Sequence, residues 1–304
     1  MSLVAVGTVA FDDIETPTGR AENVIGGACT YISLAASYFT KPVKIVSVVG
    51  DDFPKNTLDY LESRGVDLKG LQIKAGEKSF FWAGKYHRDL NTRDTLDTQL
   101  NVLATFDPVL PADYRNPKYL MLGNLTPAVQ LRVLDQLESR PKLIAIDTMN
   151  FWMDTAMDDL KEVLKRVDVL TINDEEARQL SGEHSLVNAA KTIHKMGPKF
   201  LVIKKGEHGA LLFHEKLMFY APALPLAEVT DPTGAGDTFA GGFMGYLAQT
   251  DDVNFDNLKR AVIFGSAMAS FCVEKFSIDR LKELDQERIH ARVQEFADLV
   301  HFKV

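Results

Sequence analysis

Short apolar runs rich in β-branched residues recur along the chain, and stretches with a helical pattern separate them. The runs at 3–7 and 44–50 end in glycine, as buried parallel strands often do. Further strand candidates lie at 118–124, 142–147, 167–173 and 199–206. The helical candidates lie at 26–39, 53–65, 127–139, 155–166, 174–181 and 187–196. This alternation predicts an α/β fold with a doubly wound, mostly parallel sheet flanked by helices.

Two intervals interrupt this alternation. Residues 12–24 are polar and lie between a strand and a helix, and residues 71–105 form too long a stretch for a plain connection. The second interval carries the aromatic residues Phe80, Phe81, Trp82 and Tyr86. We expect both intervals to form a small β lid, inserted into a single domain that spans 1–304.

The charge of the chain argues against some classes of partner. With 42 acidic and 34 basic residues, the formal net charge of -8 gives no bulk attraction to nucleic acid or anionic membranes. The sequence contains no apolar run long enough to span a bilayer and no signal-peptide pattern. Cys29 and Cys272 lie far apart without a CxxC motif, which argues against a disulfide framework or a zinc site. We therefore expect a cytoplasmic protein with small-molecule partners.

Polar residues and glycines follow the predicted strands. Ligands of α/β sheets bind outside the carboxyl ends of the strands, so these positions are the first candidates for a site. They are Asp12, Asp13, Gly26, Gly27, Gly50, Asp51, Asp52, Asn124, Asp147, Asn173, Glu176, Lys205 and Gly206. Carboxylates, amides and glycines suit hydroxyl recognition, coordination of metal-bound water and close approach to phosphate.

The segment DPTGAGDTFAGGF at 231–243 combines glycines with a carboxylate ahead of a helical pattern. Backbone N–H groups at a helix N-terminus attract anions, so Gly234, Ala235 and Gly236 predict an anion hole. Asp237 follows in the first turn, where it could accept a proton from a nearby hydroxyl group. A hydroxyl, a base and an anion hole together describe phosphoryl transfer to an alcohol. Taken alone, the same residues also fit a capped helix.

Five other segments precede this one in an order typical of one protein family. They are Gly7 with Asp12, IGGACTYISLAASYF at 25–39, VVGDDFPKNTLDYLESRGVD at 48–67, NDEE at 173–176 and VIKKGEHGALL at 202–212. Together with the segment at 231–243, they resemble the PfkB/ribokinase-like family of carbohydrate and nucleoside kinases. Because the resemblance extends over nearly the whole chain, we expect the fold and the reaction of that family.

At the catalytic end, the resemblance implies that Asp237 is the general base. The glycine segment beside it would hold the transferring phosphoryl group on its N–H groups. The residues implied to bind the nucleotide are Asn173, Lys205, Gly206, Thr233, Gly234 and Gly236. Asn173 and Glu176 would position Mg²⁺, largely through water. Two alternatives stay open: Glu176 as a first-turn carboxylate stabilised by its helix dipole, and Lys205 as a solvated side chain.

At the acceptor end, the resemblance implies that Asp12, Gly26 and Gly27 hold sugar hydroxyls, with Asp13 as a competing carboxylate. Family members that bind simple sugars carry asparagine where this chain has Tyr31. That tyrosine either contacts the acceptor or belongs to the core. The V-T-x-G motif of the family reads IKKG at 203–206, and 269–277 lacks the usual glycine after the helix. These departures leave the acceptor open.

We therefore expect an ATP- and Mg²⁺-dependent kinase that phosphorylates a hydroxymethyl group of a sugar or sugar-like substrate. Tyr31 and the lid aromatics leave a nucleoside kinase of the same fold as the alternative, since aromatic rings could stack on a base. A non-catalytic sugar- or nucleotide-binding regulator is a third hypothesis. Arg88 and Arg93 could meet a phosphate on a phosphosugar acceptor or be surface charges. A K⁺ requirement and a homodimer formed through the lid are also compatible with the resemblance.

Overall fold

A computed structural model describes residues 2–301, and a nine-stranded sheet forms the centre of this part of the chain. Its strands follow the order β13 (Leu217–Ala221), β12 (Ala210–His214), β11 (Phe200–Lys204), β10 (Val169–Asn173), β9 (Leu143–Asp147), β8 (Tyr119–Leu122), β1 (Leu3–Val6), β4 (Val43–Gly50) and β5 (Val66–Lys74). The pairs from β11 to β5 are parallel, whereas β12 and β13 form an antiparallel hairpin at one edge. The predicted doubly wound, mostly parallel sheet is confirmed.

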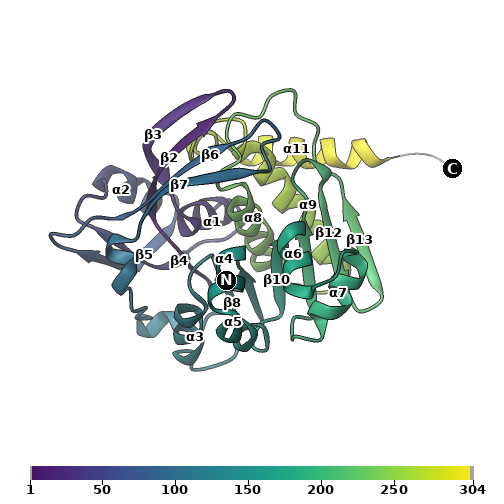
Figure 1. Ribbon diagram of the computed structural model, residues 1–304, viewed down its shortest axis with the longest axis horizontal. Helices are drawn as coiled ribbons and strands as arrows, with labels where there is room; N and C mark the ends of the chain where they lie inside the picture. The colour runs from purple at the N-terminus through teal and green to yellow at the C-terminus, as the bar shows by residue number, and fades with distance from the viewer. Residues whose placement is uncertain (1, 302–304) are drawn as a thin grey trace.

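Helices cover both faces of this sheet (Figure 1). Successive residues of β1 alternate between two hydrophobic cores, with Leu3 and Ala5 in one and Val4 and Val6 in the other. The first core is closed by α1 (Ala28–Ala36), α2 (Lys55–Ser63), α8 (Ala235–Thr250), α9 (Phe255–Cys272), α10 (Asp279–Lys282) and α11 (Gln286–Val300). The second is closed by α3 (Pro127–Asp135), α4 (Asn150–Thr155), α5 (Met157–Leu164), α6 (Asp174–Ser181) and α7 (Leu186–His194). None of these helices, within residues 2–301, has the length and apolarity of a membrane span.

The lid is a separate four-stranded sheet with the order β3 (Gly19–Gly26), β2 (Ala10–Thr16), β6 (Phe80–Tyr86) and β7 (Arg93–Gln99). In Figure 1 it lies along the top of the molecule, next to α1. Its bounds differ from the expected intervals. The first segment begins at Ala10, and residues 71–74 belong to β5 of the large sheet, where Leu71 pairs with Ser47. Local periodicity does not predict β5, because this edge strand alternates only loosely between buried and half-exposed residues.

The order of the strands creates a crevice at the carboxyl ends of β1 and its neighbours. From β1 the chain continues on one side to β4 and β5, and later on the other side to β8, β9, β10 and β11. Ligands of doubly wound sheets bind where the strand order reverses in this way. The lid strands leave the large sheet at this same end, since β2 follows β1 after three residues.

Candidate active site

The glycine segment forms the N-terminus of α8. Gly234 is the N-cap residue in the left-handed conformation, with φ of 73°, and Asp237 lies in the first turn. Ala235 donates its N–H to the Pro232 carbonyl at 3.2 Å. Among residues 2–301, the N–H groups of Gly234, Gly236 and Asp237 have no hydrogen-bond partner. These groups can therefore donate to an anion, aided by the helix dipole.

Tyr31 lies directly beneath this turn. A Cβ atom on Gly234 would come within 2.4 Å of the Tyr31 ring, so the turn requires glycine at this position. Tyr31 is 1% exposed and belongs to the first hydrophobic core, and its hydroxyl has no partner among the described residues. This placement corresponds to the core position that the sequence left open as the alternative to acceptor contact.

Asp237 is half-buried and faces charged neighbours on several strands. Loss of hydration raises its pKa to about 7, the charge of Asp147 adds to the rise, and Lys204 and Arg93 oppose it. A carboxylate with a pKa near neutrality is well matched to accepting a proton from a hydroxyl group at physiological pH.

Asp12 is buried at the start of the lid, near enough to Asp231 and Asp237 for their charges to act on it. Its Oδ2 would lie 1.9 Å from a Cβ on Gly26, so the missing side chain of Gly26 provides the room for this carboxylate. Burial raises the pKa of Asp12 to about 8, and the charges of Asp231 and Asp237 add to the effect. Asp13, the competing candidate, instead accepts the N–H of Asn23 within the lid at 2.6 Å.

Gly27 is the N-cap residue of α1 with φ of 90°, a conformation suited to glycine. It follows Gly26 directly, so both residues of the double glycine lie at the junction between β3 and α1.

Asn173 and Glu176 form a capping box at the start of α6. Asn173 Oδ1 accepts the Glu176 N–H at 2.8 Å, and Glu176 Oε2 accepts the Asn173 N–H at 2.7 Å. Burial raises the pKa of Glu176 to about 7, with Asp147 adding to the rise and Lys204 opposing it. No cluster of three or more His, Cys, Asp or Glu residues suited to a metal occurs within residues 2–301. Any Mg²⁺ here would need water or substrate oxygens as further ligands, which is usual for this ion.

Lys204 and Asp147 join these residues, although neither was assigned a role from the sequence. Lys204 Nζ lies 3.0 Å from Asp147 Oδ2, and a Cβ on Gly236 would lie 3.0 Å from the same Nζ. Asp147 was noted only as a strand-end carboxylate. Lys204 was visible as a departure from the V-T-x-G motif of the family, and a charged residue at the end of a buried strand was the signal that could have identified it.

Of the other residues expected on the nucleotide side, Gly206 and Thr233 contact the lid. Lys205 is half-buried and donates its N–H to the Gly209 carbonyl at 2.8 Å. Gly206 has φ of 54°, and a Cβ there would lie 2.1 Å from Oδ1 of Asn91 in the lid. Thr233 Oγ1 donates to the Tyr86 hydroxyl at 3.1 Å. The lid therefore contacts both loops that flank the N-terminus of α8.

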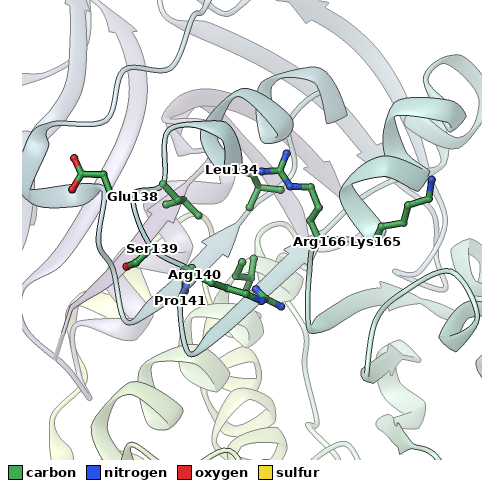
Figure 2. A pocket seen from close by; sticks show the side chains of 9 residues that line it. Leu134, Glu138, Ser139, Arg140, Pro141, Lys165 and Arg166 are labelled. Atoms are coloured by element: carbon green, nitrogen blue, oxygen red, sulfur yellow. The ribbon is translucent and has the colours of Figure 1, made fainter.

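Two cavities of similar volume lie at different ends of the large sheet. One, of about 310 Å³, opens between the lid and the end of β4 and is lined by Phe11, Asn23, Asp52, Lys78, Ser79, Phe81, Gln99 and Asn101. The other, of about 350 Å³, lies at the amino ends of β9 and β10 (Figure 2). Its Arg140 pairs with Asp168 and its Arg166 with Asp135. This second cavity is at the opposite end of the sheet from Asp237, and the lining of the first includes neither Asp12 nor a residue of the double glycine or of α8.

Comparison with known proteins agrees with this arrangement. Residues 2–282 match the pfkB family carbohydrate kinase profile. The cytidine kinase of Thermococcus kodakarensis is 32% identical over 250 residues, which cover 80% of this chain and 87% of the relative.

Solved structures show the same fold. A candidate ribokinase II from E. coli, in complex with ATP and Mg²⁺, has a TM-score of 0.79 at 18% identity and covers 96% of this chain and 99% of its own. A nucleoside kinase of Burkholderia thailandensis, in complex with inosine, also has a TM-score of 0.79 at 18% identity and covers 97% of both chains. Since the family profile extends over most of the sequence and the cytidine kinase is similar along most of its length, the chain belongs to the pfkB family of carbohydrate kinases.

Proposed function

We propose that this protein is an ATP-dependent kinase that transfers the γ-phosphoryl group to a hydroxymethyl group of a nucleoside. The observation that carries the proposal is Asp237 in the first turn of α8, beside the unpaired N–H groups of Gly234 and Gly236. A base and an anion site within one helical turn are what transfer from ATP to an alcohol requires. The similarity to a cytidine kinase favours a nucleoside over the simple sugar that the sequence suggested first.

In this reaction the hydroxymethyl oxygen forms a bond to the γ-phosphorus, and the bond from that phosphorus to the bridging oxygen breaks. ADP leaves with the electron pair of the broken bond, and Asp237 accepts the proton of the hydroxyl group. The N–H groups of Gly234 and Gly236 donate to the oxygens of the phosphoryl group. Ala235 contributes less, because its N–H already donates to Pro232. Asp12 accepts hydrogen bonds from the sugar hydroxyls, next to Gly26 and Gly27.

We further propose that Asn173 and Glu176 hold Mg²⁺ through water, near the phosphates of ATP. Their oxygen donors suit this ion, and Oε1 of Glu176 is not part of the capping box. When bound, Mg²⁺ neutralises phosphate charge. Thr233, Lys205 and Gly206 complete the proposed nucleotide side. A K⁺ requirement is a separate hypothesis, which exchange of K⁺ for Na⁺ in the assay buffer tests.

An aromatic residue of the lid supports a base-bearing acceptor. Trp82 pairs with Asp12 across β6 and β2, so these two side chains lie on the same face of the lid sheet, whereas Phe11 and Phe81 lie on the other face. An aromatic ring on the face of Asp12 suits stacking on the face of a nucleobase.

An ADP-release assay over nucleosides, free sugars and sugar phosphates tests the proposal. We expect kcat/KM to be highest for a nucleoside. Turnover of a free sugar but of no nucleoside would assign the acceptor to the simple sugars. Asp237→Asn is expected to lower kcat by about 10²–10⁴-fold, while Asp159→Asn on the exposed face of α5 serves as the matched control. Binding of ATP and a nucleoside without any turnover by the wild type would instead identify a non-catalytic regulator.

The location and the oligomeric state are further hypotheses. We propose a cytoplasmic protein that acts on small molecules and pairs with a second copy through the lid. The edge strand β7 is exposed along its length, which leaves its backbone available for such pairing. Light scattering after size exclusion measures the mass in solution, and a monomer at all concentrations would contradict the dimer.

A further inference from the structure

We infer that Lys204 is a further catalytic residue, whose ammonium group binds the transferring phosphoryl group opposite the N-terminus of α8. Asp147 is the positioning residue that holds this ammonium in place. The inference rests on the proposed kinase function, and it assigns to this chain a phosphate-binding cation at a position where the V-T-x-G motif of the family has threonine.

The fold places Lys204 between the two halves of the proposed phosphate site. Lys204 is the last residue of β11, and it pairs in register with Asn173, the last residue of β10. On its other side, Nζ lies 3.0 Å from where a Cβ of Gly236 would stand. The ammonium therefore lies beside the unpaired N–H group of Gly236 and one strand away from the proposed metal ligands.

Lys204 is largely buried and has hydrogen-bond donors available for a ligand. Its side chain is 19% exposed, and Asp147 Oδ2 at 3.0 Å is its one hydrogen-bond partner among residues 2–301. A lysine ammonium carries three N–H donors, of which the ion pair with Asp147 uses one.

Three carboxylates around one lysine give the crevice a negative potential, which would repel the triphosphate of ATP. A phosphoryl group can enter only if cations offset these charges. Arg93 of the lid also lowers the pKa of Asp237, but its side chain is exposed and screened by solvent. Lys204 is shielded from solvent, so its interaction with a phosphoryl oxygen is the stronger of the two.

During transfer, the bond to ADP breaks as the bond to the acceptor oxygen forms, and negative charge is spread over the γ-phosphoryl oxygens and over the attacking and leaving oxygens. Lys204 donates an N–H to one of the γ-phosphoryl oxygens and keeps its proton throughout. The acceptor proton moves to Asp237, so the two residues have separate tasks.

A purely structural role makes a different prediction. If Lys204 served only as the counterion of Asp147, then removing both charges together would restore a well-packed neutral pair. If Lys204 binds the phosphoryl group, the double variant would remain as impaired as the single one. A double-mutant cycle therefore separates the two roles.

The experiment compares Lys204→Met, Asp147→Asn and the double variant with the full-length wild type. Lys216→Met, in the exposed turn between β12 and β13, is the matched control. Calorimetry measures binding of ADP and of a non-hydrolysable ATP analogue, and thermal melts confirm folding. Loss of one charge-assisted hydrogen bond is expected to weaken binding of the ATP analogue to Lys204→Met about 10- to 100-fold, while the affinity for ADP stays unchanged. The expected loss of kcat is about 10²–10³-fold, and the double variant shows the same loss.

Recovery of wild-type kcat in the double variant would overturn the inference. An equal loss of affinity for ADP and for the ATP analogue in Lys204→Met would overturn it as well. The binding comparison does not require an acceptor. If the wild type phosphorylates no compound, the proposed function fails. A selective loss of affinity for the ATP analogue in Lys204→Met then still tests whether Lys204 binds the phosphoryl group. If the wild type is active and Lys204→Met is equally active, the inference alone fails.

Discussion

Three carboxyl groups of the site retain their protons to higher pH than exposed carboxyl groups do. Loss of hydration raises the pKa of Asp12 to about 8 and those of Glu176 and Asp237 to about 7. Neighbouring carboxylates add to each shift, because parallel strands bring their acidic ends to one crevice. Lys204 and Arg93 offset part of this charge. At the scale of single residues, the site is therefore prepared for proton transfer near neutral pH.

The pH dependence of kcat/KM tests the state of Asp237. The base must be ionised to accept a proton, so activity is expected to rise with pH through about 7 and to level off above it. The measurement is kcat/KM between pH 5.5 and 9 on the wild type and on Asp237→Asn. The residual activity of the variant should lack this rise. A rise that persists in Asp237→Asn would assign it to another group, such as Glu176.

Asp12→Asn is expected to stabilise the ligand-free protein at alkaline pH. The pKa of Asp12 in the folded state is about 8, above its usual value of 3.8, so below that usual value the carboxyl is protonated in both the folded and the unfolded state and adds no pH dependence to stability. As pH rises from 4 to 8, Asp12 ionises in the unfolded state before it ionises in the folded state. The free energy of unfolding of the wild type therefore falls by roughly 1.4 kcal/mol per pH unit at most. Urea titrations at pH 4 and pH 8 measure the difference between variant and wild type. Equal differences at both pH values would contradict the raised pKa.

The start of α8 shows how one element combines an anion site with core packing. Gly234 brings the chain into the left-handed conformation, and the ring of Tyr31 on α1 occupies the space of its missing side chain. The α1 and α8 helices pack closely because Gly241 and Gly245 lie against Ile32 and Ala36. Small residues on α8 thus hold the proposed anion site close to α1.

Gly234→Ala is expected to destabilise the protein and to impair binding of the ATP analogue. The matched control is Gly182→Ala at the end of α6, which has a similar φ of 70° but no atom within 4 Å of its Cβ. Both variants carry backbone strain of roughly 1–2 kcal/mol. Only Gly234→Ala adds a clash with the Tyr31 ring, 2.4 Å away. Urea unfolding and calorimetry compare them, and equal losses of stability would show that Tyr31 moves aside without cost.

At the scale of the whole molecule, the lid is tied to the body by packing and hydrogen bonds. Phe11 of β2 contributes to the first hydrophobic core. Thr18 Oγ1 donates to the Thr230 carbonyl at 3.1 Å, and Ser277 Oγ donates to the Ile25 carbonyl at 2.5 Å. These contacts support the expectation of a single folding unit that includes the lid.

The two tryptophans report separately on lid and body, since Trp82 lies in β6 and Trp152 in α4. Variants with Trp82→Phe or Trp152→Phe leave one tryptophan each. If lid and body unfold together, fluorescence of both variants follows the same urea transition, after correction for any shift in overall stability by circular dichroism. An earlier transition for the remaining Trp82 would show that the lid unfolds independently.

Local patterns predicted most of the secondary structure. Apolar strands such as β4 and β10 are buried on both faces, so they appear as continuous runs of β-branched residues. The edge strand β5 lacks that burial and was assigned in part to the lid. The predicted helix at 155–166 corresponds to the end of α4 and to α5, which meet at Ala156. Edge strands and helix junctions depend on contacts with residues far along the chain, and local periodicity contains no information on those contacts.

The sequence by itself determined the α/β architecture, the family resemblance and the proposed chemistry at 231–243, because these depend on residues close together in the chain. Only the tertiary structure decided which residues meet. It placed Asp12 against Gly26 and bonded Asp13 within the lid, placed the Tyr31 ring under Gly234, and paired Lys204 with Asp147. Side-chain direction, burial and ion pairing arise when strands from distant parts of the sequence align at one edge of the sheet, and the pairing of strands is a property of the folded chain.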